Sequence, residues 1–134
     1  MAIKQTTAVR NAQLDALSSQ TGTSAKLRIY NGTRPANANT AITSQTMLVE
    51  LTCNASGFAA AASGGVLTAN AISNGTAAAT GTASWFRLWQ SNGTTAIMDG
   101  DVATAAADLN LNNTSIATGQ TVSVSSFTIT DGDG

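Results

Sequence analysis

The chain has 134 residues, of which 43% are hydrophobic and 10% are charged, and its formal net charge is −1 at pH 7. This length fits a single domain, and the near-neutral charge argues against a basic surface for nucleic-acid binding. The sequence contains no histidine, the commonest metal ligand and general base, so we expect no enzyme, no metal site and no cofactor.

Alanine supplies much of the apolar content. The sequence has 25 alanines and only six aromatic residues, and an alanine side chain buries little surface. At about 25 cal/mol per Å² of buried apolar surface, such a core gives a small hydrophobic stabilisation. The composition therefore favours stabilisation by assembly or by a very regular β framework. The 21 threonines favour the β framework, because branching at Cβ suits a strand.

The charged residues are unevenly distributed along the chain. Five of the six cations lie in the first 34 residues, and five of the seven anions lie in the last 36. The five cations are Lys4, Arg10, Lys26, Arg28 and Arg34. The five anions are Asp99, Asp101, Asp108, Asp131 and Asp133. This separation suits contacts between subunits of an assembly, or neutralisation of the two ends within one chain.

Cys53 is the only cysteine, so an intrachain disulfide is impossible, and we expect a small buried side chain there. The N-terminus has no apolar segment of the signal-peptide kind. The longest alanine run, 59–62, is too short to cross a bilayer. We therefore expect a soluble protein that is made in the cytosol and has no membrane partner.

The first expected element is a short helix. Thr6 or Thr7 is a suitable N-cap, and the break is expected near Thr21-Gly22. An isolated helix of this length is unstable in water, so it must dock on its own domain or on a neighbour. Its expected apolar stripe consists of Val9, Ala12, Ala16 and Leu17.

Four strands are expected before the centre of the chain, from alternation of polar and apolar residues or from short apolar runs. They cover 25–30, 47–53, 66–73 and 76–83. The segment 31–45 contains the only proline and few large side chains, so we expect a loop. Small residues indicate a flexible connection over 54–65, and Asn74-Gly75 indicates a turn between the last two strands.

The stretch 82–101 holds both tryptophans and the clearest turn signal, Asn92-Gly93 between two apolar runs. Both turn residues tolerate positive φ, as a two-residue type I′ turn requires, so we predict a β-hairpin. The expected cross-strand partners are Leu88 with Ile97, Trp89 with Ala96, and Arg87 with Met98. We expect the pairing to end or bulge where Asp99 faces Phe86.

The two faces of this hairpin have different expected roles. One face is expected to join the core, through Phe86, Leu88 and Ile97. The other is expected to meet an opposite sheet or a neighbouring subunit, and its residues are Trp85, Arg87, Trp89 and Met98. If the two indoles are buried they belong to the core. If they are exposed they form a protein interface or a sugar-stacking platform.

The last part of the chain contains an alanine-rich segment with several aspartates, expected to form a short helix or a loop. Strands are expected at 108–111 and 121–130. The apolar side changes at Ser125-Ser126, which indicates a β-bulge or a strand that passes between sheets. The final DGDG, 131–134, is expected to be a frayed tail.

These seven to nine short strands predict a mainly β fold, an antiparallel β-sandwich or jelly roll with a short N-terminal helix. Residues 1–134 are expected to form one β-sandwich domain, with 1–22 as an N-terminal helical arm.

No catalytic constellation is visible. The chain has no histidine to activate a hydroxyl and no nucleophile-elbow motif. The two Asp-Gly-Asp sequences, 99–101 and 131–133, resemble fragments of calcium loops but lack the rest of such a loop, so ordinary acidic turns are favoured. Glu50, the only glutamate, is expected to pair with Arg28 or Arg87 instead of acting as an acid.

Four stretches share the texture of one group of proteins. They are the opening MAIKQTTAVRNAQLDAL with GTSAKLRIYNGTRPAN, the central SWFRLWQSNGT, the segment ADLNLNN, and GQTVSVSSFTIT. Together they cover most of the chain and resemble small virion proteins encoded by tailed bacteriophages. Within that group, proteins of this size and composition are often head-decoration, or capsid cement, proteins.

The resemblance implies a β-sandwich that binds the outside of an icosahedral shell as a homodimer or homotrimer and stabilises the mature head. The implied partner is the major capsid protein, and the implied location is the virion. Candidate contact residues are Lys4, Arg10, Trp85, Arg87 and Trp89. A tail or baseplate structural protein, with tail proteins as partners, is one alternative. The other is a carbohydrate-binding module that uses Trp85 and Trp89.

Overall fold

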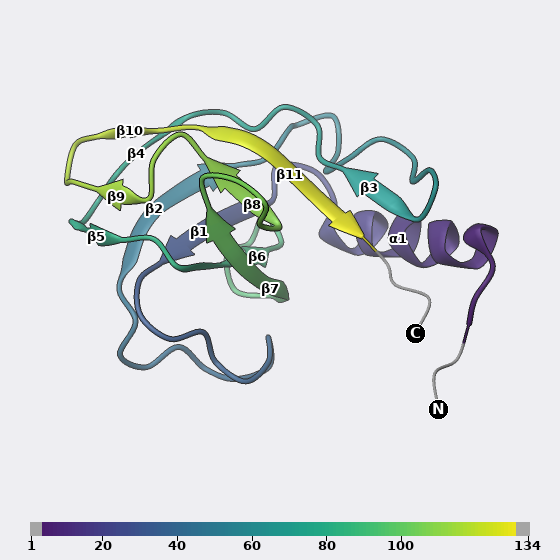
Figure 1. The fold of residues 1–134 in the computed structure, drawn as a ribbon, viewed down its shortest axis with the longest axis horizontal. Helices are drawn as coiled ribbons and strands as arrows, with labels where there is room; N and C mark the ends of the chain where they lie inside the picture. Colours follow the sequence, from purple (N-terminus) through teal and green to yellow (C-terminus); the bar gives the residue numbers. More distant parts are fainter. Residues whose placement is uncertain (1–3, 131–134) are drawn as a thin grey trace.

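The structure is a computed structural model that describes residues 4–130. In these residues the chain forms one helix and eleven strands (Figure 1). The helix is α1 (Thr7–Thr21), and the strands are β1 (Lys26–Tyr30), β2 (Met47–Thr52), β3 (Val66–Thr68), β4 (Gly75–Thr76), β5 (Gly81–Thr82), β6 (Trp85–Trp89), β7 (Ala96–Ala103), β8 (Leu109–Leu111), β9 (Ser115–Ile116), β10 (Thr121–Val122) and β11 (Val124–Thr130). The mainly β class with a short N-terminal helix is therefore confirmed.

Seven strands form one curled sheet in the order β2-β1-β6-β7-β8-β11-β3 (Figure 1). Two small ribbons, β10-β4 and β5-β9, accompany it. Every neighbouring pair in the large sheet is antiparallel except β7 and β8, which run parallel. The expectation of a purely antiparallel sheet is therefore wrong, because the chain reverses twice between Ala103 and Leu109 and returns in the direction of β7. The sandwich or jelly-roll arrangement stays a prediction.

The core lies against one face of this sheet. Leu27 and Ile29 of β1 and Phe86 and Leu88 of β6 are fully buried. Phe127 of β11 packs edge-to-face on Phe86, with ring centroids 5.1 Å apart. Its ring also meets Phe58 edge-to-face at 5.6 Å, although the sequence predicted only a flexible connection around Phe58. The few large side chains are thus gathered in one cluster.

Helix α1 begins and ends where the sequence predicts. Its N-cap is Thr6, whose hydroxyl accepts a hydrogen bond from Val9 N at 3.3 Å. The expected apolar stripe is wrong, because Val9 is 46% exposed and the buried apolar side chain is Leu14. None of the helices in the part of the chain that the structure describes is long and apolar enough to cross a membrane.

Polar contacts fix the helix beside β3 (Figure 1). The Asp15 carboxylate accepts from Ala62 N at 2.8 Å, and the Asn11 side chain accepts from Gly65 N at 2.8 Å. Both acceptors satisfy backbone groups of the segment that leads into β3. A search for apolar periodicity misses this docking, because the helix uses carboxylate and amide oxygens for it.

Both outer edges of the seven-stranded sheet are covered. The segment after β3 runs along β2, where Ala78 N donates to Leu48 O at 2.7 Å. Gly75 lies in that segment, and a Cβ there would come within 2.8 Å of Glu50 O. The turn predicted at Asn74-Gly75 is wrong, since Gly75 starts β4 and permits close packing on β2. At the other edge, Ser63 and Val66 bond to each other beside helix α1.

The central hairpin is formed by β6 and β7, with Trp89 opposite Ala96 as predicted. Ile97 is an extra residue in a β-bulge, so Leu88 faces Met98 and Arg87 faces Asp99. The other two predicted partners are wrong by this one residue. The pairing then continues to Trp85 and Asp101, beyond the expected end.

The turn of this hairpin is longer than the expected two residues. Gln90 N donates to Thr95 O, and Gly93 N donates to Gln90 O. Gly93 has a φ of 70°, whereas Asn92 is not among the residues with positive φ, so the turn is not type I′. The Asn92 side chain instead accepts from the backbone N–H groups of Thr94 and Thr95.

The C-terminal part follows the sequence more closely. The alanine-rich segment expected to form a short helix or a loop instead continues β7 to Ala103, and only residues 104–108 form a loop. The predicted change at Ser125-Ser126 is confirmed as a register shift between Val124 and Ser126 in the pairing of β11 with β8. The tail predicted at 131–134 lies outside the described residues.

Candidate functional site

Four charged side chains form a row across four neighbouring strands. Arg28 of β1 pairs in register with Glu50 of β2 on one side and with Arg87 of β6 on the other, and Arg87 faces Asp99 of β7. The row therefore reads minus, plus, plus, minus. Two like charges directly opposite each other are unfavourable, and the flanking carboxylates help to offset this repulsion. The predicted pairing of Glu50 with Arg28 is confirmed, at 2.7 Å.

Arg87 is the buried member of this row. Its side chain is 3% exposed, and it donates to both carboxylate oxygens of Asp99, at 2.6 and 2.9 Å. It also donates to Thr40 O at 2.8 Å and to Asn37 O at 3.3 Å. A planar guanidinium with five donors suits this environment, because it can bind several acceptors at once.

The aromatic rings stack against the same guanidinium groups. Trp85 stacks on Tyr30 with ring centroids 4.5 Å apart. Arg87 lies over Trp85 at 5.5 Å and over Trp89 at 5.7 Å, and Arg28 lies over Trp89 at 5.2 Å. We call these five residues the Trp–Arg cluster. Burial raises the pKa of the Tyr30 hydroxyl, an effect that its neighbours Trp89, Arg28 and Arg87 partly offset.

A loop of the same chain covers the Trp–Arg cluster. Residues 31–46 contain no helix or strand, as predicted, and they supply the carbonyls that Arg87 binds. Asn31 O accepts from the indole N–H of Trp85 at 3.0 Å. Within the described residues this loop, and not an opposite sheet, covers Trp85 and Arg87 on this hairpin face, and contact of the face with a neighbouring subunit stays a prediction. Backbone carbonyls make the cover, and the sequence contains no signal for them.

The predicted contact residues therefore do not share one surface. Trp85 is 1% exposed and Arg87 2%, and Trp89 is half-buried. Lys4 and Arg10 belong to the N-terminal helical segment, which lies on the far side of the molecule from the loop (Figure 1). A sugar-stacking platform needs an accessible ring face, and Trp85 offers none in this arrangement.

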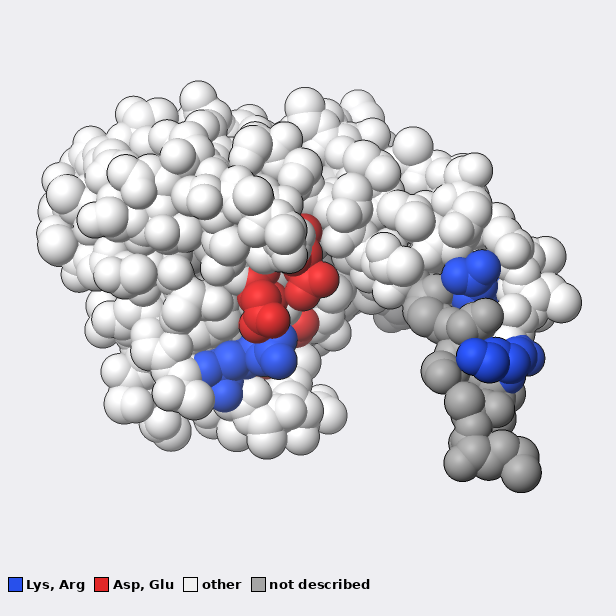
Figure 2. All heavy atoms as spheres, viewed as in Figure 1, with Lys and Arg blue, Asp and Glu red and all other residues white. Residues whose placement is uncertain are grey.

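The uneven charge distribution is at least partly neutralised within the chain. Arg34, from the loop, pairs with Asp101 of β7 at 3.2 Å, which joins the cation-rich beginning to the anion-rich end. Figure 2 shows these charges gathered around a hollow, while most of the face is uncharged. Asp99 and Asp101 lie in strand β7, so the Asp-Gly-Asp sequence there forms neither a calcium loop nor an acidic turn.

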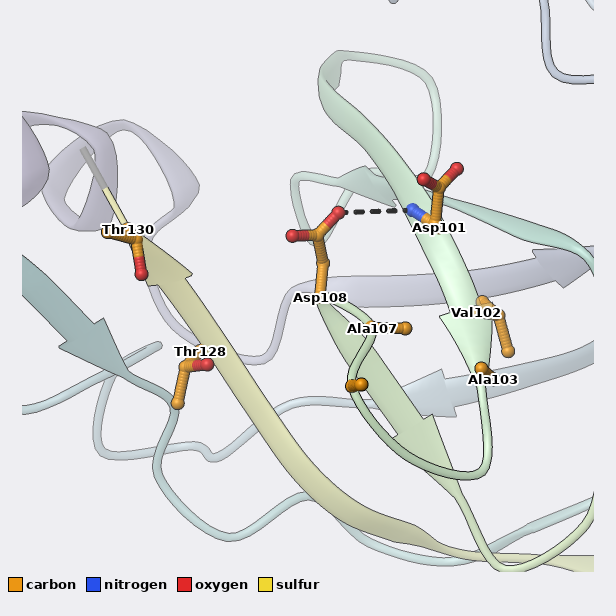
Figure 3. A pocket seen from close by; sticks show the side chains of 8 residues that line it. Asp101, Val102, Ala103, Ala107, Asp108, Thr128 and Thr130 are labelled. Carbon is orange, nitrogen blue, oxygen red and sulfur yellow. Dashed lines mark hydrogen bonds between the residues drawn. The ribbon is translucent and has the colours of Figure 1, made fainter. Parts of the chain in front are cut away.

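A cavity of about 440 Å³ lies where β7 and β11 diverge (Figure 3). Its lining residues are Asp101, Val102 and Ala103 of β7, Ala106, Ala107 and Asp108 of the following turn, and Thr128 and Thr130 of β11. One Asp108 oxygen accepts from Asp101 N at 3.2 Å. No signal in the sequence predicts this cavity, because only the fold brings Thr128 and Thr130 beside residues 101–108.

No group of three or more Cys, Asp or Glu residues within 4–130 is placed to hold a metal ion. Cys53 is 3% exposed, as predicted, and burial raises the pKa of its thiol to about 11. At neutral pH it is therefore the protonated thiol, which is a poor nucleophile. Comparison with known protein families, curated proteins and solved structures found no match.

Proposed function

We propose that this chain is a structural protein of a tailed-bacteriophage particle, and specifically a capsid decoration, or cement, protein. The observation that carries the proposal is the character of its surface. Only 10% of the residues are charged, and Arg28, Arg34 and Arg87 are each paired with a carboxylate of the same chain. Most of the face in Figure 2 carries no charged side chain, and the sequence is rich in Ala, Ser and Thr.

Such a surface suits permanent burial against another protein. Burying an unpaired charge is costly, and this surface offers few of them. Ordering a long flexible side chain costs about 0.5–1.5 kcal/mol on binding, whereas Ala, Ser and Thr lose little. A chain rich in Ala and Thr therefore loses less free energy per contact when it attaches to a shell in many copies.

The proposed mechanism is stabilisation by binding. A protein that bridges capsid subunits of the mature shell, and binds free or immature subunits less well, raises the stability of the mature shell by mass action. The proposed partner is the major capsid protein, the protein acts as a homodimer or homotrimer, and its location is the virion. The proposal includes a β-sandwich or jelly roll in which the two ribbons contribute to a second layer.

The test compares particles made with and without this protein. Complete particles are expected to release their genome at a higher temperature and to survive osmotic shock better. Adding the purified protein back to deficient particles should restore both properties. Equal resistance of deficient and complete particles would contradict the cement role.

A further inference from the structure

The seven-stranded sheet has one gap between neighbouring strands, and this gap lies between β7 and β11, away from both outer edges of the sheet. Both outer edges are covered by other segments of the chain, as described above. Between β7 and β11, however, the intervening strand β8 is only three residues long. It pairs with Val102 and Ala103 of β7 and with Val124 to Phe127 of β11. Within residues 4–130, no strand occupies the place beyond the start of β8.

The width of this place is set by the strands on either side. At β8 the flanking strands are two strand spacings apart, about 9.6 Å, which is the width that one extended chain fills. Beyond β8 the two strands diverge, so an added strand can pair with both of them only at the inner end of the gap. Beyond β8, β7 continues back from Asp101 to Ala96, and β11 continues to Thr130. The cavity in Figure 3 lies between these two strand segments.

The backbone groups at this place are only partly satisfied by the chain itself. Val102 N donates to Ser84 O toward β6, so the preceding N–H, that of Asp101, points to the open side. It is bonded to the side chain of Asp108 and not to a strand. On the opposite wall, Thr128 N donates to Asp108 O. Asp108 thus lies just before the first residue of β8 and closes only part of the gap.

We propose that the gap between β7 and β11 is a docking site for an extended, basic segment of another protein, which adds a strand in line with β8. The inference rests on the proposed function in that the segment would belong to the shell protein. Strand addition uses main-chain hydrogen bonds for affinity and alternate side chains for specificity. An uncovered strand edge invites this mode of binding.

Charge identifies the kind of segment. Asp101 and Asp108 place two exposed carboxylates at the mouth of the gap, and Thr128 and Thr130 add hydroxyl groups. Figure 2 shows the acidic side chains gathered on the wall of the hollow. Arg34 is paired with Asp101, which leaves the gap with more acidic than basic groups. A lysine or arginine on the incoming strand complements this charge, and an acidic segment is repelled.

The experiment uses the full chain, labelled with ¹⁵N, and a blocked heptapeptide of sequence Thr-Lys-Val-Thr-Val-Lys-Thr. Its lysines lie on one face of the extended chain and its valines on the other. Saturable changes in amide chemical shift are expected at Asp99, Asp101 and Thr130. Replacing both lysines by glutamate is expected to weaken binding about tenfold or more. N-methylation of the two valines, which removes donors but keeps the charge, is expected to abolish it.

Two variants of the protein complete the design. Asp108→Asn is expected to weaken peptide binding several-fold, whereas Asp15→Asn, a matched change on helix α1, is expected to leave it unaltered. Absence of saturable shifts, shifts outside the gap, or equal binding of the N-methylated peptide would overturn the proposal. Shifts at the same amides that depend only on protein concentration would show that a second copy is the occupant, and would also overturn it. Since no particle is involved, failure here leaves the cement role standing.

Discussion

The Arg87–Asp99 ion pair is the contact on which the interior depends most. Both side chains are nearly inaccessible, at 3% and 6% exposed, and Arg28 lies next to Arg87 in the charge row. Removing one partner from a buried pair leaves an uncompensated charge, which typically costs 3–5 kcal/mol. Here the remaining charge would also face a like charge.

Asp99→Ala is therefore expected to lower the free energy of unfolding by about 3–5 kcal/mol in urea denaturation. The matched control is Glu50→Ala at the other end of the row. Its side chain is 35% exposed, so its loss is expected to cost only about 0–1 kcal/mol. Equal costs for the two variants would show that burial does not decide the strength of these pairs.

The buried thiol of Cys53 is expected to make the free energy of unfolding depend on pH in the alkaline range. Its pKa rises from an ordinary value of 9.0 to about 11 in the folded chain, because burial disfavours the thiolate. The unfolded chain therefore loses this proton at lower pH than the folded chain. The stabilisation is complete below pH 9 and is lost as the pH rises toward 11. Urea midpoints measured across this range should fall, and less so in Cys53→Ala. An unchanged slope in the variant would contradict the assignment.

At the scale of elements, the two faces of β6 and β7 impose different packing requirements. Gly100 of β7 lies opposite Phe86, and any Cβ at this position would overlap the Phe86 ring. Gly100 has no positive φ, so its role is to leave room and not to permit a turn. The hairpin can join the core only because this one position lacks a side chain.

Gly100→Ala is expected to destabilise the fold by about 1–3 kcal/mol through overpacking, measured by thermal or urea unfolding. Gly119→Ala provides the comparison. At Gly119 an added Cβ meets nothing within 4 Å. Only the backbone φ of 86° at this residue opposes an alanine, and the expected loss of stability is about 1 kcal/mol. A Gly100 variant as stable as wild type would show that the Phe86 ring moves freely.

Local signals in the sequence predicted the elements that depend on local chemistry. The cap at Thr6, the strands over Lys26–Tyr30 and Met47–Thr52, and the bulge near Ser126 all follow from side chains close in sequence. The bulge at Ile97 was missed, because one inserted residue leaves the alternation of its neighbours almost unchanged. The strands predicted over 66–73 and 76–83 are longer than those observed, since this stretch forms only β3, β4 and β5 and part of it follows the edge of β2.

The candidate site was less predictable than the elements. The tryptophans and Arg87 were recognised as a group, but the loop that covers them binds through the carbonyls of Asn31, Asn37 and Thr40. Every residue has such a carbonyl, so composition cannot reveal the cover. The gap between β7 and β11 likewise arises from the length of β8, which is a property of the whole sheet.

At the scale of the whole molecule, the structure combines an interior in which the buried Arg87 is fully paired with a surface that carries little charge. The charge row and the covering loop bury the most distinctive side chains within the chain itself. Three members of the Trp–Arg cluster, Tyr30, Trp85 and Arg87, and also Cys53, therefore have almost no exposed surface. The surface of low charge and the gap between β7 and β11 are the features that remain available to a partner protein. Both are consistent with a protein whose role is to bind other proteins.

The most direct test of the structural role is a density map of purified particles produced from the genome that encodes this chain. The proposal predicts density of this fold at symmetry-related positions on the outside of the mature head. Density on the tail or baseplate would place the protein elsewhere in the particle and contradict the cement role. Its absence from the particle altogether would contradict any structural role in the virion.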